Sequence, residues 1–141
     1  MIYAFILNSV LVATAVLIHF EALNWLTKII PTLNIKPRAR VLFGVFGAIF
    51  AHVVEIWAFA FGYYFMIHQG GFGSLEGHFD KSLMDCSYYS FVSYTSLGFG
   101  DIIAKGDMRF LSGLEALTGL VLISWTASFM FIEMQKFWKD H

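Results

Sequence analysis

Three long apolar stretches dominate the hydrophobic pattern of the chain. They begin at Ile2, Val41 and Phe110, and only a few polar residues interrupt each of them. About 20 apolar residues in helical conformation are enough to cross a bilayer. The pattern therefore predicts three transmembrane helices, over residues 1–27, 41–68 and 109–135.

A shorter, moderately apolar segment, residues 82–94, lies between the second and third stretches. It is too short to span a membrane, but it suits a half-helix that enters the bilayer and turns back. Asp80 or Ser82 is suited to cap its first turn. The next residues, 95–101, are polar and contain two glycines, so their backbone carbonyls need partners if they lie at membrane depth.

The loops between these segments predict an orientation. Residues 28–40 carry four positive charges and no acidic residue, and Pro31 and Pro37 argue against a helix there. Positive loops lie on the cytoplasmic side. We therefore expect residues 28–40 to be a cytoplasmic linker, with the N-terminus outside, an extracellular loop at 69–81 and a short cytoplasmic tail at 136–141.

The composition limits the class of protein. The chain is 58% hydrophobic and 13% charged, whereas soluble domains are about 45–50% apolar and about 25% charged. Its net charge of −1 gives no basic surface for nucleic acid. Cys86 is the only cysteine, which excludes an intrachain disulfide framework. We expect an all-α membrane protein whose main environment is the lipid bilayer, without a soluble domain.

Residues 95–101 read Thr-Ser-Leu-Gly-Phe-Gly-Asp, between a half-helix and a long apolar helix. This stretch resembles the Thr-Val-Gly-Tyr-Gly-Asp signature of the potassium-channel superfamily, and the likeness extends over about residues 41–133. The resemblance implies a pore domain at 41–135 and a selectivity filter at 95–101. It also implies a homotetramer, because one filter strand per chain must be repeated around an axis. The first helix is an addition to this plan.

Position by position, the resemblance assigns the filter to seven residues: Thr95, Ser96, Leu97, Gly98, Phe99, Gly100 and Asp101. The two glycines match the family and allow backbone angles closed to other residues. Ser96 keeps a hydroxyl where the family has threonine, whereas Phe99 lacks the phenol of the usual tyrosine. The resemblance implies that K+ binds at Ser96, Leu97, Gly98 and Phe99.

Supporting roles follow from the same resemblance. Tyr88 and Tyr89 stand where aromatic residues brace many such filters. We expect Glu115 to bond the half-helix, at Ser93 or at a tyrosine. Gly119 matches the hinge glycine of the inner helix, and ordinary helix packing at a small residue is the alternative.

One face of the third helix is a candidate lining of the central cavity. Ser124 and Ser128 are four residues apart and share a face, together with Leu120. Serines in helices also bond back to their own backbone, which is the alternative interpretation.

Ionisable residues inside apolar helices should face protein or water. His52 and Glu55 share a face of the second helix, and His19 lies at a comparable depth in the first. The pattern predicts a cluster with two possible roles. It is either a proton sensor, since histidine titrates near neutral pH, or a polar clasp that joins the added helix to the pore.

The sequence leaves three alternatives to a potassium channel. The main alternative is a weakly selective monovalent cation channel. A small membrane enzyme would need His19, His52, Glu55 and Glu115 as metal ligands, but no His-Glu-x-x-His motif is present. An accessory subunit would not need an intact filter sequence. We expect a channel in a plasma membrane, not an enzyme, with K+ as the permeant ion and no cofactor.

Overall fold

The computed structural model describes residues 1–139 and is mostly helical. Its elements, in chain order, are α1 (Ile2–Ile29), a 3-10 turn (Ile30–Thr32), α2 (Pro37–Gln69), β1 (Ser74–Gly77), α3 (Leu83–Tyr94), β2 (Ile102–Lys105) and α4 (Asp107–Lys139). Three of the helices, α1, α2 and α4, are long and apolar enough to cross a membrane. The predicted set of three long apolar helices is therefore confirmed.

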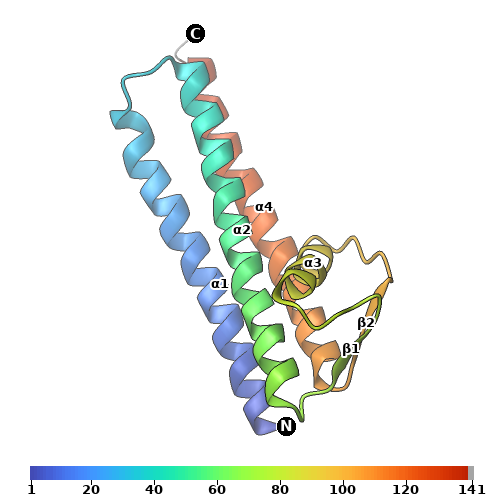
Figure 1. Cartoon of the computed structure of the whole chain (residues 1–141). Helices are drawn as coiled ribbons and strands as arrows, with labels where there is room; N and C mark the ends of the chain where they lie inside the picture. Colours follow the sequence, from blue (N-terminus) through green and yellow to red (C-terminus); the bar gives the residue numbers. More distant parts are fainter. Residues whose placement is uncertain (140–141) are drawn as a thin grey trace.

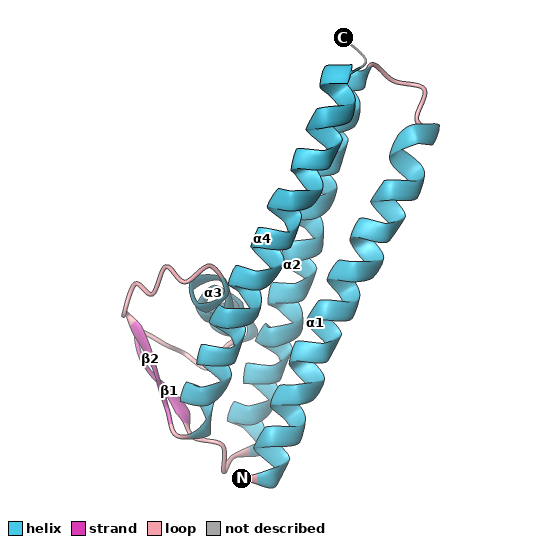
Figure 2. Ribbon diagram, turned by 180° about the vertical axis from the view of Figure 1, so that it is seen from behind, coloured by secondary structure: helices cyan, strands magenta, loops and turns pink. Residues whose placement is uncertain are grey.

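The three long helices lie side by side, and α3 lies beside α2 and α4 in the half nearer the N-terminus (Figure 1). The N-terminus and residue 139 are at opposite ends of the bundle. The α1–α2 connection is at the same end as residue 139, as the reverse view also shows (Figure 2). The short strands project to one side, next to α3.

Small residues bring α1 close to α2. A Cβ atom on Gly47 would lie 2.7 Å from Leu26 Cδ2, and one on Gly62 would lie 2.4 Å from Leu11 Cδ1. The leucine side chains of α1 therefore fill the spaces that these glycines leave on α2. Close backbone approach at small residues is the usual basis of helix association in membranes.

The helices are longer than the sequence pattern predicted. Pro37 does not interrupt a helix but occupies the first turn of α2, where its missing N–H has no helical partner to lose. The expected linker 28–40 is helical at both ends, and residues 33–36 join the two helices. At the other end, α4 begins at Asp107 and continues to Lys139, through the described part of the expected tail.

A two-stranded antiparallel sheet is the one element type that the all-α expectation did not include. It pairs Ser74 with Lys105 and Gly77 with Ile102. A Cβ atom on Gly73 would lie 2.0 Å from the Lys105 carbonyl oxygen, and one on Gly77 would lie 2.2 Å from that of Asp101. The two glycines therefore allow the loop before α3 to contact the loop after it.

Helix α3 begins at the predicted place, and Ser82 rather than Asp80 caps it. The Ser82 hydroxyl accepts a hydrogen bond from the Asp85 amide at 3.0 Å, and the Asp85 carboxylate accepts one from the Asp80 amide at 2.8 Å. At the other end of α3, Tyr94 meets Gly119 of α4, where a Cβ atom would lie 2.0 Å from the Tyr94 carbonyl oxygen. Gly119 thus allows the end of α3 to touch the backbone of α4.

This contact makes Gly119 and Gly113 a matched pair for mutation. In Gly119→Ala the new methyl group meets a backbone atom, and we expect a loss of about 1–3 kcal/mol in stability from overpacking. Gly113 lies on the same helix with no atom within 4 Å of its Cβ position. Gly113→Ala should therefore stabilise α4 by roughly 0.5–1 kcal/mol. Thermal unfolding in detergent measures both, and equal melting temperatures would contradict the close contact.

Candidate functional site

The residues after α3 form an exposed segment, Thr95–Asp101, on the surface of the single chain. Helix α3 ends with hydrogen bonds from the Thr95 amide to the Phe91 carbonyl at 3.2 Å and from the Ser96 amide to the Ser93 carbonyl at 3.1 Å. Two large apolar side chains in the segment, Leu97 and Phe99, are 62% and 65% exposed. Large apolar side chains exposed side by side often mark a surface that contacts another molecule.

Every second residue of this segment has a positive φ. The values are +61° at Ser96, +59° at Gly98 and +84° at Gly100. Glycine adopts this region freely, whereas an L-residue such as serine pays about 1 kcal/mol or more. The sequence indicated the glycine positions but not Ser96, whose conformation also ends α3.

The segment is held at both ends. The Gly98 amide donates to the Val92 carbonyl at 3.4 Å. At the far end, the Tyr88 hydroxyl donates to Asp101 Oδ2 at 2.8 Å, and the His78 amide donates to the Asp101 carbonyl at 3.0 Å. The hydrogen bond to Asp101 raises the pKa of the Tyr88 phenol above its ordinary value.

A second group of polar side chains lies behind α3 and is called here the Glu115 cluster. Side-chain hydrogen bonds between α2, α3 and α4 link its five members: Tyr63, Tyr89, Ser90, Ser112 and Glu115. The fully buried Glu115 carboxylate accepts from Ser90, and from the Tyr63 hydroxyl at 2.7 Å. Tyr89 bonds Ser112 at 2.6 Å and does not reach the exposed segment.

The predicted partner of Glu115 was thus partly wrong. Ser90 takes the place expected for Ser93, because Ser90 is on the buried side of α3 and faces α4. Ser93 contributes its carbonyl to the Ser96 amide. Its hydroxyl forms no hydrogen bond within residues 1–139. The tyrosine partner is Tyr63, which comes from α2 rather than from α3.

The serines of α4 lie on an exposed face with Leu120. The Ser124 hydroxyl donates to the Leu120 carbonyl at 2.8 Å, and the Ser128 hydroxyl donates to the Ser124 carbonyl at 3.3 Å. Both serines therefore bond back to their own helix, and both remain exposed.

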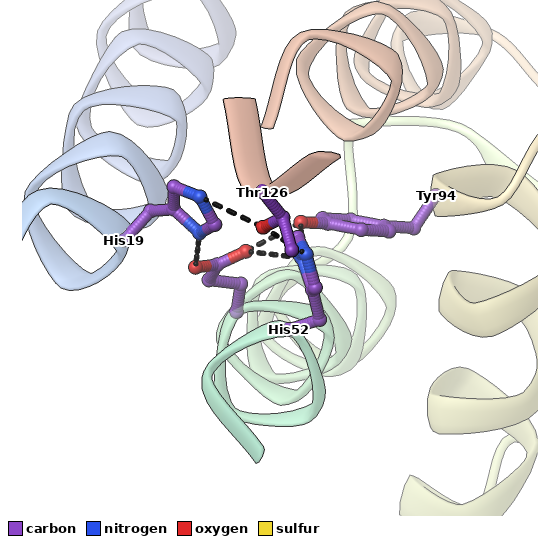
Figure 3. A network of polar contacts seen from close by, with 5 residues as sticks. His19, His52, Tyr94 and Thr126 are labelled. Carbon is purple, nitrogen blue, oxygen red and sulfur yellow. Dashed lines mark hydrogen bonds and ion pairs between the residues drawn. The ribbon is translucent and has the colours of Figure 1, made fainter. Parts of the chain in front are cut away.

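The structure brings His19, His52 and Glu55 together with Tyr94 and Thr126, and these five residues are called here the Glu55 cluster (Figure 3). Glu55 Oε1 is 2.8 Å from His19 Nδ1, and Glu55 Oε2 is 3.2 Å from His52 Nδ1 and accepts from Tyr94. His19 and Glu55 are fully buried. The cluster links all four helices, since Tyr94 belongs to α3 and Thr126 to α4.

Sequence reasoning found the histidines and Glu55 but missed Tyr94 and Thr126. Helical spacing relates residues three or four apart on one helix. Tyr94 lies 42 positions after His52 in the sequence, and Thr126 lies 74 positions after it. Hydroxyl groups in apolar helices are a weak signal, because most of them bond back to their own helix.

Glu115 does not join this group. Its carboxylate accepts hydrogen bonds from Ser90 and Tyr63. The four residues considered as metal ligands are therefore divided between two clusters, with Glu115 in one and His19, His52 and Glu55 in the other. The four-residue ligand set of the membrane-enzyme alternative is therefore not formed within residues 1–139, although ligand atoms of His19, His52 and Glu55 lie within 4.8 Å of one another.

A comparison with protein families matches residues 40–136 to an ion channel family. The match covers most of the chain, and the chain belongs to this family of membrane ion channels, not to a class of enzymes. Helix α1 lies outside the matched residues. Neither a comparison with curated proteins nor one with solved structures gave a match.

The Glu115 cluster leads to a prediction about stability. Tyr63→Phe removes a buried hydroxyl that donates to a carboxylate, and we expect a loss of about 1.5–3 kcal/mol. The neighbouring Tyr64 is the matched control, because its hydroxyl has no hydrogen-bond partner among the described residues. Thermal unfolding in detergent compares Tyr63→Phe with Tyr64→Phe. Equal stability of the two variants would show that the Tyr63–Glu115 bond contributes little.

Proposed function

We propose that the chain is the subunit of a potassium-selective channel with its filter at Ser96–Gly100. The observation that carries the proposal is the alternation of positive φ at Ser96, Gly98 and Gly100 in an exposed segment directly after α3. Such alternation lets successive carbonyl groups turn toward one side of the strand. A line of carbonyl oxygens replaces the hydration shell of a permeating cation.

The proposed assembly is a homotetramer. A single strand cannot surround an ion, so the segment must be repeated around an axis. The chain also presents an apolar face on α4 that residues 1–139 leave uncovered, with side chains at Leu117, Val121 and Ile123. Together with the exposed Leu97 and Phe99, this face supports packing against further copies around the filter.

In this assembly four α3 helices direct their C-terminal ends, at Tyr94, toward the centre. The negative ends of the helix dipoles favour a cation there. The Ser96 hydroxyl lies at the inner end of the filter and Asp101 at its outer mouth. Leu120, Ser124 and Ser128 line the cavity below the filter. The main role of Gly119 is to let α3 pack closely on α4.

The proposed orientation follows the charges of the connections. The α1–α2 connection with Lys36, Arg38 and Arg40 is cytoplasmic, and the β1–β2 sheet is at the outer mouth. Because residue 139 is at the same end of the bundle as this connection, the C-terminal end is cytoplasmic too (Figure 1). The membrane is proposed to be a plasma membrane.

A weakly selective cation channel is the second candidate, and Phe99 favours it. Its side chain has no hydroxyl group and is 65% exposed, so in the single chain it does not tie the filter to α3. The outer part of the filter then depends on the Tyr88–Asp101 bond. A looser filter discriminates less well between K+ and Na+ because selectivity depends on the carbonyl positions.

The reversal potential in planar bilayers under a K+/Na+ gradient tests the proposal. We expect a potential close to the potassium equilibrium value. A potential near zero with clear single-channel openings would favour the weakly selective channel. A protein that carries no current at any pH from about 5 to 8, across the ordinary histidine range, would contradict both.

A glycine variant tests the filter itself. Gly98→Ala forces an L-residue to φ +59°, and we expect loss of potassium current or of selectivity. Gly113→Ala changes the same residue type on α4, away from the filter, and should leave the reversal potential unchanged. An unaltered current in Gly98→Ala would place the filter elsewhere.

A further inference from the structure

The Glu55 cluster closes into a ring of hydrogen-bonding groups (Figure 3). From Glu55 the ring passes through His19 to Thr126, where His19 Nε2 and Thr126 Oγ1 are 3.2 Å apart. Thr126 Oγ1 is 2.8 Å from His52 Nε2, and His52 Nδ1 is 2.7 Å from the Tyr94 hydroxyl, which returns to Glu55. Both nitrogens of both histidines are therefore used.

The number of hydrogens that the ring needs follows from these contacts. The contacts His19–Glu55, His19–Thr126 and His52–Thr126 need one hydrogen each. Tyr94, His52 Nδ1 and Glu55 Oε2 form a triangle that needs two. The ring therefore needs five hydrogens.

The five side chains in their ordinary neutral-pH states supply only four hydrogens. The hydroxyls of Tyr94 and Thr126 supply one each, a neutral imidazole supplies one for each histidine, and an ionised Glu55 supplies none. With four hydrogens, two lone pairs face each other at one contact, which is costly for a buried group. We infer that the ring is a binding site for one additional proton, shared between Glu55 and the two histidines.

The charge of the ring leads to the same result. With five hydrogens its net charge is zero, either as a carboxylate with one imidazolium or as a carboxylic acid with two neutral imidazoles. With four hydrogens it is −1, and His19 and Glu55 are fully buried between helices that cross the membrane. An uncompensated charge there is expensive.

The surroundings supply no other compensating charge. Helix α4 adds the Trp125 ring, which lies edge-on to His19 with the ring centroids 5.2 Å apart. The two buried carboxyl groups of α4 bond other residues: Glu115 bonds Ser90 and Tyr63, and Glu133 bonds Lys136. No lysine or arginine side chain of residues 1–139 bonds a member of the ring. The additional proton is therefore the group that neutralises Glu55.

The ring also connects the added helix to the filter. His19 is its only member from α1, and Tyr94 is the last residue of α3, directly before Thr95. Loss of the proton breaks one contact of the ring and leaves a negative charge, which weakens the support of Tyr94. This step rests on the proposed function: potassium current should fall as the pH rises and the proton leaves.

The proton count is measured without reference to conduction. The protein in lipid bilayers, labelled with ¹⁵N-histidine and carrying glutamine at His68, His78 and His141, is examined by solid-state NMR at pH 7. Infrared difference spectra against Glu55→Gln report whether Glu55 is protonated. We expect three protonated ring nitrogens with an ionised Glu55, or two with a protonated Glu55. Any other total overturns the inference.

Thr126→Val provides a second variant that keeps the shape of the side chain. Without the bridging hydroxyl, one hydrogen on each histidine and that of Tyr94 satisfy every remaining contact, so only the charge of Glu55 still favours the additional proton. We therefore expect Thr126→Val to lose the additional proton at a lower pH than the wild type, in the same ring-nitrogen and infrared signals. Thr14→Val is the matched control, since the Thr14 hydroxyl bonds only the Val10 carbonyl, and it should retain the wild-type pattern. A Thr126→Val protein that releases the proton at the same pH as the wild type overturns the bridging role.

The current tests the connection to the filter. Above the midpoint of its titration, the population with five hydrogens falls about tenfold per pH unit. The wild-type potassium current should fall with it, whereas that of Thr126→Val should begin to fall at a lower pH. A wild-type current that is constant with pH overturns the connection. The absence of current at every pH refutes the proposed function and leaves the proton count to be judged by NMR.

Discussion

Ionisable groups buried inside a membrane bundle need partners within it, and this constraint organises the structure. The fully buried carboxylates Glu55 and Glu115 lie on different helices. Each accepts hydrogen bonds from hydroxyl groups of neighbouring helices, because unpaired charges in this environment are costly. Helix α3 supplies a donor to both, Tyr94 to Glu55 and Ser90 to Glu115. A helix too short to span a membrane is thereby fixed against two that are long and apolar enough to do so.

The fixed position of α3 determines where the exposed segment Thr95–Asp101 lies. The segment begins directly after Tyr94 and ends at Asp101, which the Tyr88 hydroxyl and the β1–β2 sheet hold in place. Between these ends the backbone alternates in the sign of φ while its side chains remain exposed. The segment is thus hydrogen-bonded at both ends, whereas the side chains of Leu97 and Phe99 in its middle are exposed.

Helix α1 stands apart from the ion channel family match, which begins at residue 40. It packs on α2 through leucines that fill the spaces beside Gly47 and Gly62, and through His19 in the Glu55 cluster. The apolar contacts explain its affinity for the bundle. The His19 bond adds a specific register, because a buried imidazole without a partner would be unfavourable.

The sequence by itself determined the three long apolar helices, the short helix before residues 95–101 and the family resemblance, since these depend on local hydrophobicity and on glycine spacing. It also indicated that His19, His52 and Glu55 meet, because their depths along the helices agree. Only the tertiary structure decided that Tyr94 and Thr126 complete this cluster, that Ser90 rather than Ser93 meets Glu115, and that the loops around α3 pair as strands. These contacts join residues far apart in the chain, and they depend on helix rotation and on close approaches at Gly73, Gly77 and Gly119, which no local pattern of residues specifies.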